Sequence, residues 1–412
     1  MKHLLVIGYV WPEPNSSAAG SRMMQLLHFF MKGGYQITFA TGATRSLYAE
    51  KLEDLGITTA KIKVNDASFD DLLREIQPEI VLFDRFMMEE QFGWRVSEVC
   101  PEALKILDTE DLHFLRKVRE ISFKKGIAEQ DLLFTSEATK REIASIYRCD
   151  LSLIISEAEM ELLKNQFKVD PQLLLYLPFL LEEISGEESR GLPRFQERQH
   201  FISIGNFYHE PNWNAVLTLK EQVWPLIRKK LPNAEVHVYG AYASEKVFNL
   251  HNPHTGFLVK GRAENAEKLM QSARVCLAPI QFGAGLKGKF LQAMQCGTPG
   301  VTTTIGAEGI SGKIEWPGAI ENDPAAFADA AVNLYENEDA WKKAQSNGFN
   351  IINTRFSKSI FEKVFYNRIF ELSGKIVEHR KSNFIGAMLQ HHQHKSTYFM
   401  SKYIELKNKG KE

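Results

Sequence analysis

The sequence predicts an α/β protein built from two doubly wound, Rossmann-like domains that face a shared cleft, with a helical extension at the C-terminal end. Three observations support this fold class. The chain has 412 residues, more than a single hydrophobic core usually supports. Short apolar runs alternate with segments of helical periodicity in both halves of the chain. A polar stretch without periodicity, residues 181–199, separates the two halves as an interdomain linker does.

The first predicted domain, residues 1–180, contains short apolar runs of strand length. Amphipathic segments at 22–31 and 137–147 lie between some of them. Parallel strands need crossover connections, so strands that alternate with helices predict a mostly parallel sheet covered by helices on both faces. The predicted strands are 4–7, 37–40, 80–83, 104–107, 151–155 and 173–177.

The second predicted domain, residues 200–357, repeats this alternation. Two doubly wound units joined by a linker predict a cleft between the carboxyl ends of their strands, where open α/β sheets bind ligands. The predicted strands are 201–204, 235–239, 275–280 and 300–304, and the predicted helices are 214–231, 264–272, 289–296 and 324–335.

Residues 358–412 continue past the second domain as a helix and a basic tail. Apolar residues recur at helical spacing over 358–380. The tail beyond carries lysines that outnumber acids, with aromatic residues between them. We expect either contact with an anionic membrane surface or a helix packed on its own protein with its lysines in water. The basic residues are Arg380, Lys381, Lys395, Lys402, Lys407, Lys409 and Lys411.

Composition limits the function classes. A formal net charge of −1 gives no reason to expect nucleic acid as a partner. The four cysteines are far apart, as reduced cysteines of a cytoplasmic protein are. No segment has the roughly 18–20 consecutive apolar residues that cross a bilayer, so we expect any membrane link to be peripheral, at the inner face. Neither the cysteines nor His391, His392 and His394 predict a metal site.

The most informative stretch is a glycine loop, Gly283-Ala284-Gly285-Leu286-Lys287-Gly288-Lys289, between a predicted strand and a predicted helix. Glycines let backbone N–H groups approach a ligand, and the start of a helix carries partial positive charge. Lys287 and Lys289 add full charges. The loop predicts a phosphate or diphosphate site, and the alternative is a tight turn with solvated lysines.

Two other motifs match the same loop formally. The spacing from Gly283 to Lys289 fits a P-loop, but Phe290 stands where Mg²⁺ coordination requires Ser or Thr, which disfavours a nucleotide hydrolase. Gly283–Gly288 also fits the dinucleotide fingerprint, with Glu308 about 20 residues beyond, so an NAD-dependent oxidoreductase is an alternative. Against it, two residues separate the strand from the glycines, and the next helix is short.

The loop and the blocks around it resemble the group 1 glycosyltransferases, which have the GT-B fold. After Gly283–Lys289 the chain has Cys-Gly-Thr-Pro-Gly-Val-Thr-Thr at 296–303 and Gly-Ala-Glu-Gly at 306–309. Ser-Ile-Gly-Asn-Phe at 203–207 is similar to the start of that family's donor domain. Residues 12–22 are similar to its acceptor-side opening. The resemblance covers nearly all of residues 1–375, and its specific motifs lie mainly between 201 and 310.

The resemblance implies transfer of a sugar from a nucleoside diphosphate sugar to a hydroxyl of a glycan or lipid-linked acceptor, with retention of configuration, in cell-envelope polysaccharide synthesis. The nucleotide sugar is a co-substrate, and no cofactor or metal is expected. The second domain would bind the donor, and the helix after residue 357 would pack back on the first domain. The expected donor-binding residues are Gly205, Asn206, Gly261, Arg262, Gly283, Ala284, Gly285, Leu286, Lys287, Lys289 and Gln292.

The chain departs from the family at two positions. The family usually has a glutamate where this chain has Gln292, taken to hold the donor ribose, and often an acidic residue where it has Ala284. A glutamine still donates and accepts hydrogen bonds but carries no charge. A catalytically inactive GT-B protein that binds a sugar or a partner is therefore a second alternative.

On the acceptor side, His113 follows a predicted buried strand and is the best candidate for a hydrogen-bond donor or general base. Asp111 could instead cap the helix that holds His113. Lys287 is expected to stabilise charge on the departing diphosphate. The expected acceptor-binding residues are Gly20, Arg22 and Asp84, of which Arg22 could equally be a surface cation and Asp84 part of an ordinary ion pair.

Overall fold

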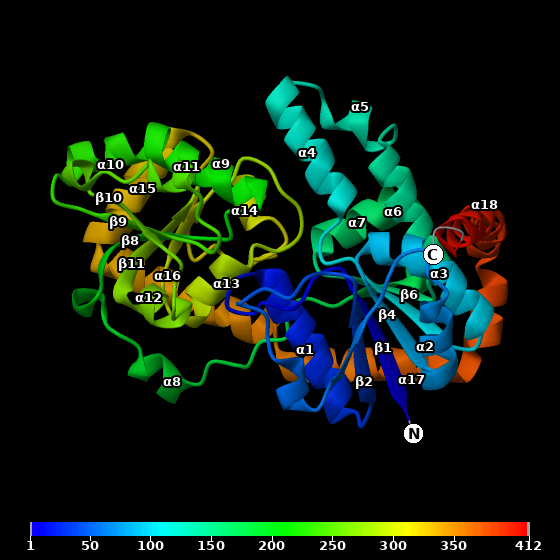
Figure 1. Ribbon diagram of the computed structural model, residues 1–412. Helices are drawn as coiled ribbons and strands as arrows, with labels where there is room; N and C mark the ends of the chain where they lie inside the picture. The colour runs from blue at the N-terminus through cyan, green and yellow to red at the C-terminus, as the bar shows by residue number, and fades with distance from the viewer. Residues whose placement is uncertain (1, 410–412) are drawn as a thin grey trace.

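The computed structural model describes residues 2–409 and contains two parallel sheets, each covered by helices (Figure 1). The first sheet has the strand order β3-β2-β1-β4-β5-β6-β7. Its strands are β1 (His3–Gly8), β2 (Gln36–Thr41), β3 (Thr58–Lys61), β4 (Ile80–Asp84), β5 (Leu104–Asp108), β6 (Leu151–Ile154) and β7 (Leu174–Tyr176).

Successive side chains of β1 pack into the two hydrophobic cores on opposite faces of the sheet, because side chains alternate across a strand. Leu5 and Ile7 pack in the core under α2 to α7, whereas Leu4 and Val6 pack in the core under α1. The continuous apolar run of a strand buried on both faces follows from this arrangement. The helices are α1 (Ala18–Lys32), α2 (Ser68–Ile76), α3 (Phe86–Val99), α4 (His113–Lys125), α5 (Glu129–Leu133), α6 (Glu137–Arg148) and α7 (Glu157–Asn165).

The second sheet has the order β10-β9-β8-β11-β12-β13. Its strands are β8 (Gln199–Ile204), β9 (Val236–Tyr239), β10 (Phe257–Gly261), β11 (Ala273–Ala278), β12 (Gly300–Thr302) and β13 (Gly318–Ile320). Around it lie α9 (Glu210–Thr218), α10 (Trp224–Lys230), α11 (Glu245–Phe248), α12 (Ala266–Ser272), α13 (Gly288–Gln295), α14 (Thr304–Ala307), α15 (Pro324–Glu336) and α16 (Glu338–Arg355).

The predicted fold class is confirmed. Both sheets reverse their strand order at one point, between β1 and β4 and between β8 and β11, where open α/β sheets place ligands. Three strands lie outside the predicted set: β3, β10 and β13, all at sheet edges. β3 consists of Thr-Thr-Ala-Lys and is at most half-buried, so it has no apolar run to detect, and β13 has three residues.

Two chain segments join the domains. Residues 181–199 include the short helix α8 (Gly186–Gly191), and α17 (Lys358–Ser382) returns the chain to the first domain. The two segments are bonded where they cross, since Leu181 N donates to Phe356 O at 2.9 Å and Lys358 N donates to Leu181 O at 2.8 Å. These bonds hold the start of the linker against the start of α17.

α17 packs on α1, as the resemblance implies for a C-terminal helix. Phe365 is fully buried and stacks on Phe29 at a ring-centroid distance of 4.6 Å. The predicted basic tail is itself a second helix, α18 (Phe384–Lys409), which lies beside α3 and α6 (Figure 1). A polar run at 391–396 interrupts its apolar spacing and hides the helix in the sequence. Lys411 and the side chains of His394 and Lys409 lie outside the described residues.

Arg22 has a role in the core of the first domain rather than at its surface. Its side chain is 1% exposed, and its Nε donates to Asp108 Oδ1 at 2.9 Å. Its Nη1 donates to the carbonyl oxygen of Leu177 at 2.7 Å. The guanidinium therefore ties α1 to the ends of β5 and β7, which corrects the expectation that it contacts an acceptor.

Replacing Arg22 with Met should destabilise the first domain by about 3–5 kcal/mol, because the Asp108 carboxylate would remain buried without its cation. Urea unfolding followed by tryptophan fluorescence measures this. Lys32→Met removes the exposed cation of the Lys32–Glu362 pair and should leave the urea midpoint nearly unchanged. Equal effects of the two substitutions would contradict the structural role of Arg22.

Candidate functional site

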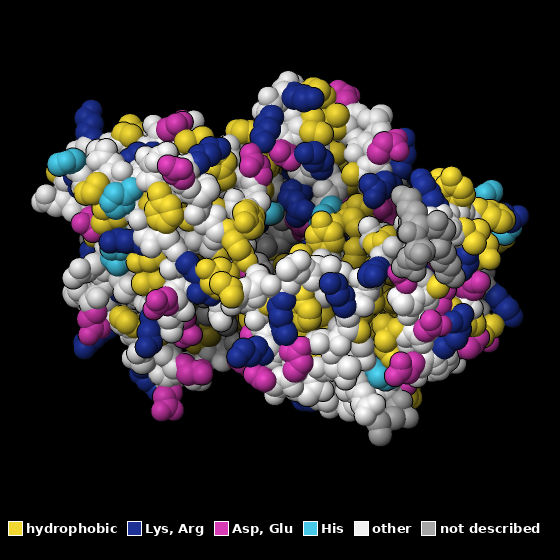
Figure 2. Space-filling model, viewed as in Figure 1, with side chains coloured by type: hydrophobic (Ala, Val, Ile, Leu, Met, Phe, Trp, Pro, Cys, Tyr) yellow, Lys and Arg dark blue, Asp and Glu magenta, His cyan; other side chains and the backbone are white. Residues whose placement is uncertain are grey.

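A cleft of about 1390 Å³ lies between the two domains. Figure 2 shows the recess between them near the centre of this face. The first domain lines it with the residues that follow β1, β4 and β5, and with the start of α1. The second domain lines it with the loops after β8, β9, β10 and β11. Ligand groups from both sheets therefore converge where the strand orders reverse.

The glycine loop joins β11 to α13 and rests against the first domain. A Cβ added at Gly285 would lie 2.7 Å from Asp111 Cβ, and the backbone of Gly285 is left-handed with φ +62°. A Cβ added at Gly288 would lie 2.8 Å from Ala18 Cβ. These glycines permit the close approach of the two domains, a role that the sequence analysis assigned only to the approach of a ligand.

Both lysines of the loop line the cleft with little exposure to solvent. Burial lowers the pKa of Lys287 and of Lys289 to about 8. Lys287 Nζ donates to Gly285 O at 2.9 Å, and Lys289 Nζ donates to Asn212 Oδ1 at 2.8 Å. At neutral pH both ammonium groups are mostly charged, at the start of α13, so the site favours an anion. The plain turn with solvated lysines is not what the structure contains.

The other expected donor residues gather near these lysines to different degrees. Gly205 leaves no room for a side chain, since an added Cβ would lie 3.0 Å from Lys289 Nζ. Arg262 lines the cleft and its guanidinium lies 4.1 Å from the centre of the Tyr48 ring, while Gly261 is the last residue of β10 behind it. The remaining expected donor residues that line the cleft are Asn206, Gly283, Ala284, Gly285, Leu286 and Gln292.

The ends of β4 and β5 supply two cleft residues that were not among the expected site residues, Arg85 and Glu110. Both have left-handed backbones, with φ +71° and +62°, and such strain in non-glycine residues is typical of functional sites. Burial raises the pKa of Glu110 to about 8. The sequence signal was a charged residue one or two positions after each buried strand.

His113 lines the cleft at the start of α4. Burial lowers its pKa to about 4, so the imidazole is neutral at physiological pH. Its Nδ1 lies 3.0 Å from the carbonyl oxygen of Asp111. The helix is capped by the buried Glu142, which accepts from the backbone N–H groups of His113 and Phe114 at 3.2 and 2.8 Å. Asp111 instead pairs with Arg116, so it does not cap the helix.

Gly20 and Asp84 lie behind the cleft wall. An added Cβ at Gly20 would lie 2.4 Å from the Glu13 backbone, so this glycine lets the preceding loop cross α1. Asp84 is 3% exposed and accepts from Tyr9 N at 2.9 Å. Both residues shape the wall. Neither of these two expected acceptor-binding residues lines the cleft itself.

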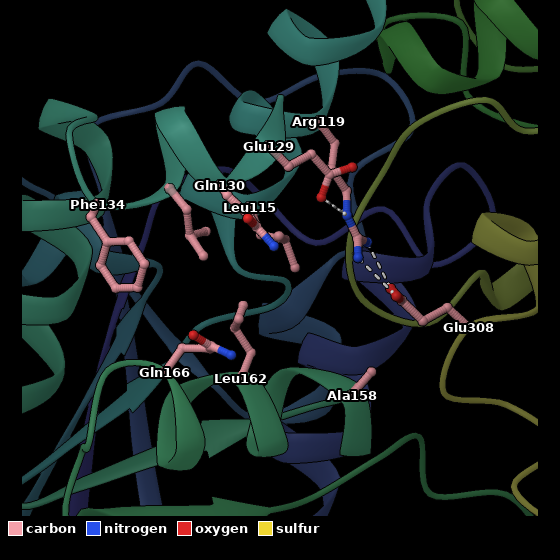
Figure 3. Close-up of a pocket in the computed structure, with 10 residues that line it drawn as sticks. Leu115, Arg119, Glu129, Gln130, Phe134, Ala158, Leu162, Gln166 and Glu308 are labelled. Carbon is pink, nitrogen blue, oxygen red and sulfur yellow. Dashed lines mark hydrogen bonds and ion pairs between the residues drawn. The ribbon is translucent and has the colours of Figure 1, made fainter. Parts of the chain in front are cut away.

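A set of polar contacts clasps the two domains beside the cleft. Arg119 on α4 forms a two-point ion pair with Glu308, at 2.7 and 2.8 Å, and donates to Gly283 O at 2.9 Å. Figure 3 shows Arg119 reaching across a pocket of about 500 Å³ to Glu308, with Glu129 beside it. Glu308 therefore forms an interdomain ion pair with Arg119. This pairing disfavours the contact with a dinucleotide ribose that the alternative fingerprint would require.

A buried carboxylate completes this contact between the domains. Glu159, with no exposed surface, accepts from Leu112 N at 2.9 Å and from Gly285 N at 2.8 Å. Burial raises its pKa to about 7. The loop of the second domain is thus hydrogen-bonded to the first domain through one side chain.

One protein-family model matches the part of the chain that contains the glycine loop. Residues 198–337 match the family model described as glycosyl transferases group 1. The match lies within the second domain. Its boundaries enclose the Gly283–Lys289 loop and the other expected donor residues. The predicted resemblance to this family of enzymes is therefore confirmed.

Solved structures with the same two-domain arrangement include S. aureus TarM, in complex with Fondaparinux, alpha-GlcNAc-glycerol and UDP. It is 12% identical, has a TM-score of 0.67, and the match covers 89% of this chain and 99% of that one. WaaG, described as a glycosyltransferase involved in lipopolysaccharide biosynthesis, is also 12% identical, with a TM-score of 0.60 and coverage of 88% and 98%. These likenesses establish the GT-B fold of the chain.

A curated relative matches part of the chain. It is an uncharacterized 44.6 kDa protein in the cps region of Klebsiella pneumoniae, 24% identical over 172 residues. The match covers 40% of this chain and 44% of that relative, so the chain spans less than half of its length.

Between residues 2 and 409, among the side chains that the structure describes, there is no group of three or more His, Cys, Asp or Glu arranged to hold a metal ion. Over the same part of the chain, no helix is both long and apolar enough to cross a membrane.

Removing the clasp should open the cleft. Arg119→Gln eliminates the pair with Glu308, so the domains should separate and the radius of gyration from small-angle X-ray scattering should rise. Lys117→Gln, on the same helix, loses only an exposed pair with Glu120 within α4 and should leave the scattering unchanged. Identical curves for Arg119→Gln and the unmodified chain would show that other contacts hold the domains.

Proposed function

We propose that this chain transfers a sugar from a nucleoside diphosphate sugar, held by the group 1 domain, to a hydroxyl of a glycan or lipid-linked acceptor held by the first domain. One observation carries the proposal. Lys287 and Lys289 lie at the wall of the interdomain cleft, at the start of α13, with neither ammonium group hydrogen-bonded to a carboxylate. Two poorly solvated cations of this kind suit a diphosphate.

In the proposed reaction the diphosphate is the leaving group. Lys287, Lys289 and the first turn of α13 would offset the negative charge that develops on it, and a closed cleft would strengthen these interactions by excluding water. This source of positive charge supports a transfer that requires no cofactor or metal. Retention of configuration at the transferred sugar is part of the proposal by analogy with the family.

The acceptor hydroxyl would lie on the opposite wall, near Arg85, Glu110 and His113. A neutral His113 can accept or donate one hydrogen bond, and a Glu110 with a pKa of about 8 is mostly protonated at neutral pH and can donate one. Domain closure would bring this hydroxyl to the sugar carbon. Glu110 and His113 would therefore orient the acceptor hydroxyl through neutral hydrogen bonds, beside the charged Arg85.

The wider setting is proposed from the relatives. WaaG acts in lipopolysaccharide biosynthesis, and the Klebsiella relative lies in the cps region, so we place this chain in cell-envelope polysaccharide synthesis. All four cysteines are buried and unpaired, which supports a reducing, cytoplasmic location.

Replacing Lys287 with Ala tests the donor site. The loss of one charge-assisted hydrogen bond should weaken UDP binding roughly 10- to 100-fold. Folding should be little affected, because a buried cation without a carboxylate bonded to it contributes little to stability. Isothermal titration calorimetry with UDP measures the change, and Lys313→Ala, an exposed lysine of the same domain, is the control. Unchanged affinity in folded Lys287→Ala protein would overturn the donor-site assignment.

Replacing Gln292 with Glu distinguishes an active enzyme from an inactive GT-B binding protein. Gln292 lines the cleft on α13 at the position of the family's glutamate, and a carboxylate accepts ribose hydroxyls with charge assistance. If the chain is an active enzyme tuned for glutamine, hydrolysis of nucleotide sugars in the absence of acceptor should fall in Gln292→Glu. A rise from no detectable turnover would instead support the inactive alternative for the natural chain.

A further inference from the structure

The face of α18 toward the protein includes small and polar residues beside the partly buried Leu389, Tyr398 and Ile404. A Cβ added at Gly386 would lie 2.2 Å from the carbonyl oxygen of Tyr147, so the helix lies against the end of α6 at this glycine. Gln390 Nε2 donates to Arg148 O at 2.9 Å. Ser401 is 1% exposed. Such residues usually face solvent on a surface helix.

An arginine of the first domain holds the far end of the helix. Arg95, 1% exposed, donates to Ser401 Oγ at 3.0 Å and forms an ion pair with Glu405. The same guanidinium pairs with Asp70 at 2.6 Å. These contacts fix the rotation of α18 about its own axis, so the side opposite Ser401 and Glu405 faces outward.

Large apolar side chains occupy the outward side. At 100° per residue, the positions of Phe384, Met388, Phe399 and Leu406 fall within about 60° of one another, and Ile385 and Tyr403 lie at the border of this stripe. Figure 2 shows hydrophobic side chains along this edge of the molecule. The exposed fractions are Phe384 76%, Ile385 48%, Met388 45%, Phe399 67%, Met400 61%, Tyr403 63% and Leu406 70%.

The charges that accompany this stripe are positive. Residues 384–409 contain four lysines and one acidic residue, Glu405. Glu405 is turned toward Arg95, whereas Lys395 and Lys407 are exposed. The outer side of α18 therefore combines apolar and cationic groups, without an exposed acidic side chain of its own among the described residues.

We propose that the outer face of α18 docks on a membrane surface rich in anionic lipids, with the helix lying in the plane of the headgroups. Apolar side chains then enter the acyl boundary and lysines contact the lipid phosphates. The polar run at 391–396, which includes two exposed histidines, is compatible with the headgroup layer. A second copy related by a two-fold axis would instead bring Lys395 and Lys407 toward equally cationic helices. Charge complementarity thus favours lipid, and the inference is independent of the proposed sugar transfer.

Co-sedimentation of the full chain with vesicles tests the proposal. Vesicles of equal parts phosphatidylglycerol and phosphatidylcholine should bind the protein, and vesicles of phosphatidylcholine alone should bind it at least tenfold less. Replacing both Phe399 and Leu406 with Gln should reduce binding to the anionic vesicles at least tenfold. The matched control is Leu226→Gln with Phe248→Gln, which removes exposed apolar side chains from α10 and α11 of the second domain and should have no effect.

Several results would overturn the proposal. They are failure of the unmodified chain to bind anionic vesicles, equal binding to both vesicle types, or equal losses in the variant and its control. Sedimentation velocity adds another: a dimer that the Phe399→Gln and Leu406→Gln changes dissociate would show that a second copy covers the face. UDP binding by the same variants should be unchanged, so failure of the membrane proposal leaves the donor-site test unaffected.

Discussion

The cleft depends on the hydrogen bonds that the buried Glu159 carboxylate makes to both domains. It accepts from Leu112 N in the first domain and from Gly285 N in the glycine loop of the second. Both hydrogen bonds are accepted by Glu159 Oε1, and a buried carboxyl oxygen is costly without such bonds, so the contact favours one relative position of the two loops. Gly285 must be glycine because Asp111 lies where a Cβ would project. The Arg119–Glu308 pair then reinforces a junction that Glu159 has positioned.

The electrostatics of the cleft are divided between its walls. The second domain contributes Lys287 and Lys289. Burial lowers the pKa of both lysines to about 8, so they are still mostly charged at neutral pH. On the first domain, burial raises the pKa of Glu110, and it lowers that of His113. The two lysines thus face a wall on which Glu110 and His113 are largely neutral hydrogen-bonding groups, beside the charged Arg85 and Asp111. This division suits a charged leaving group on one side and an uncharged hydroxyl on the other.

The C-terminal helices α17 and α18 follow the second domain in the sequence and pack on the first domain. The stacked Phe365 and Phe29 rings anchor α17, while Arg95 orients α18 through Ser401 and Glu405. The first domain consequently carries both the wall that we propose for the acceptor and the outer face of α18. A membrane bound at that face would hold the first domain, and the Leu181–Lys358 crossing would connect it to the second domain.

The amino-acid sequence by itself determined the two-domain α/β architecture and the position of the glycine–lysine loop between a strand and a helix, because apolar periodicity and the glycine–lysine pattern are local properties. It did not determine which charged residues face the cleft. Arg22, expected at the acceptor, is paired with Asp108 inside the first domain, and Glu308, a candidate for ribose binding, is paired with Arg119. Arg85 and Glu110 line the cleft instead. Ion-pair partners lie far apart in the chain, so only the packing of the strands and domains decides which charges are neutralised inside the protein and which remain available to a ligand.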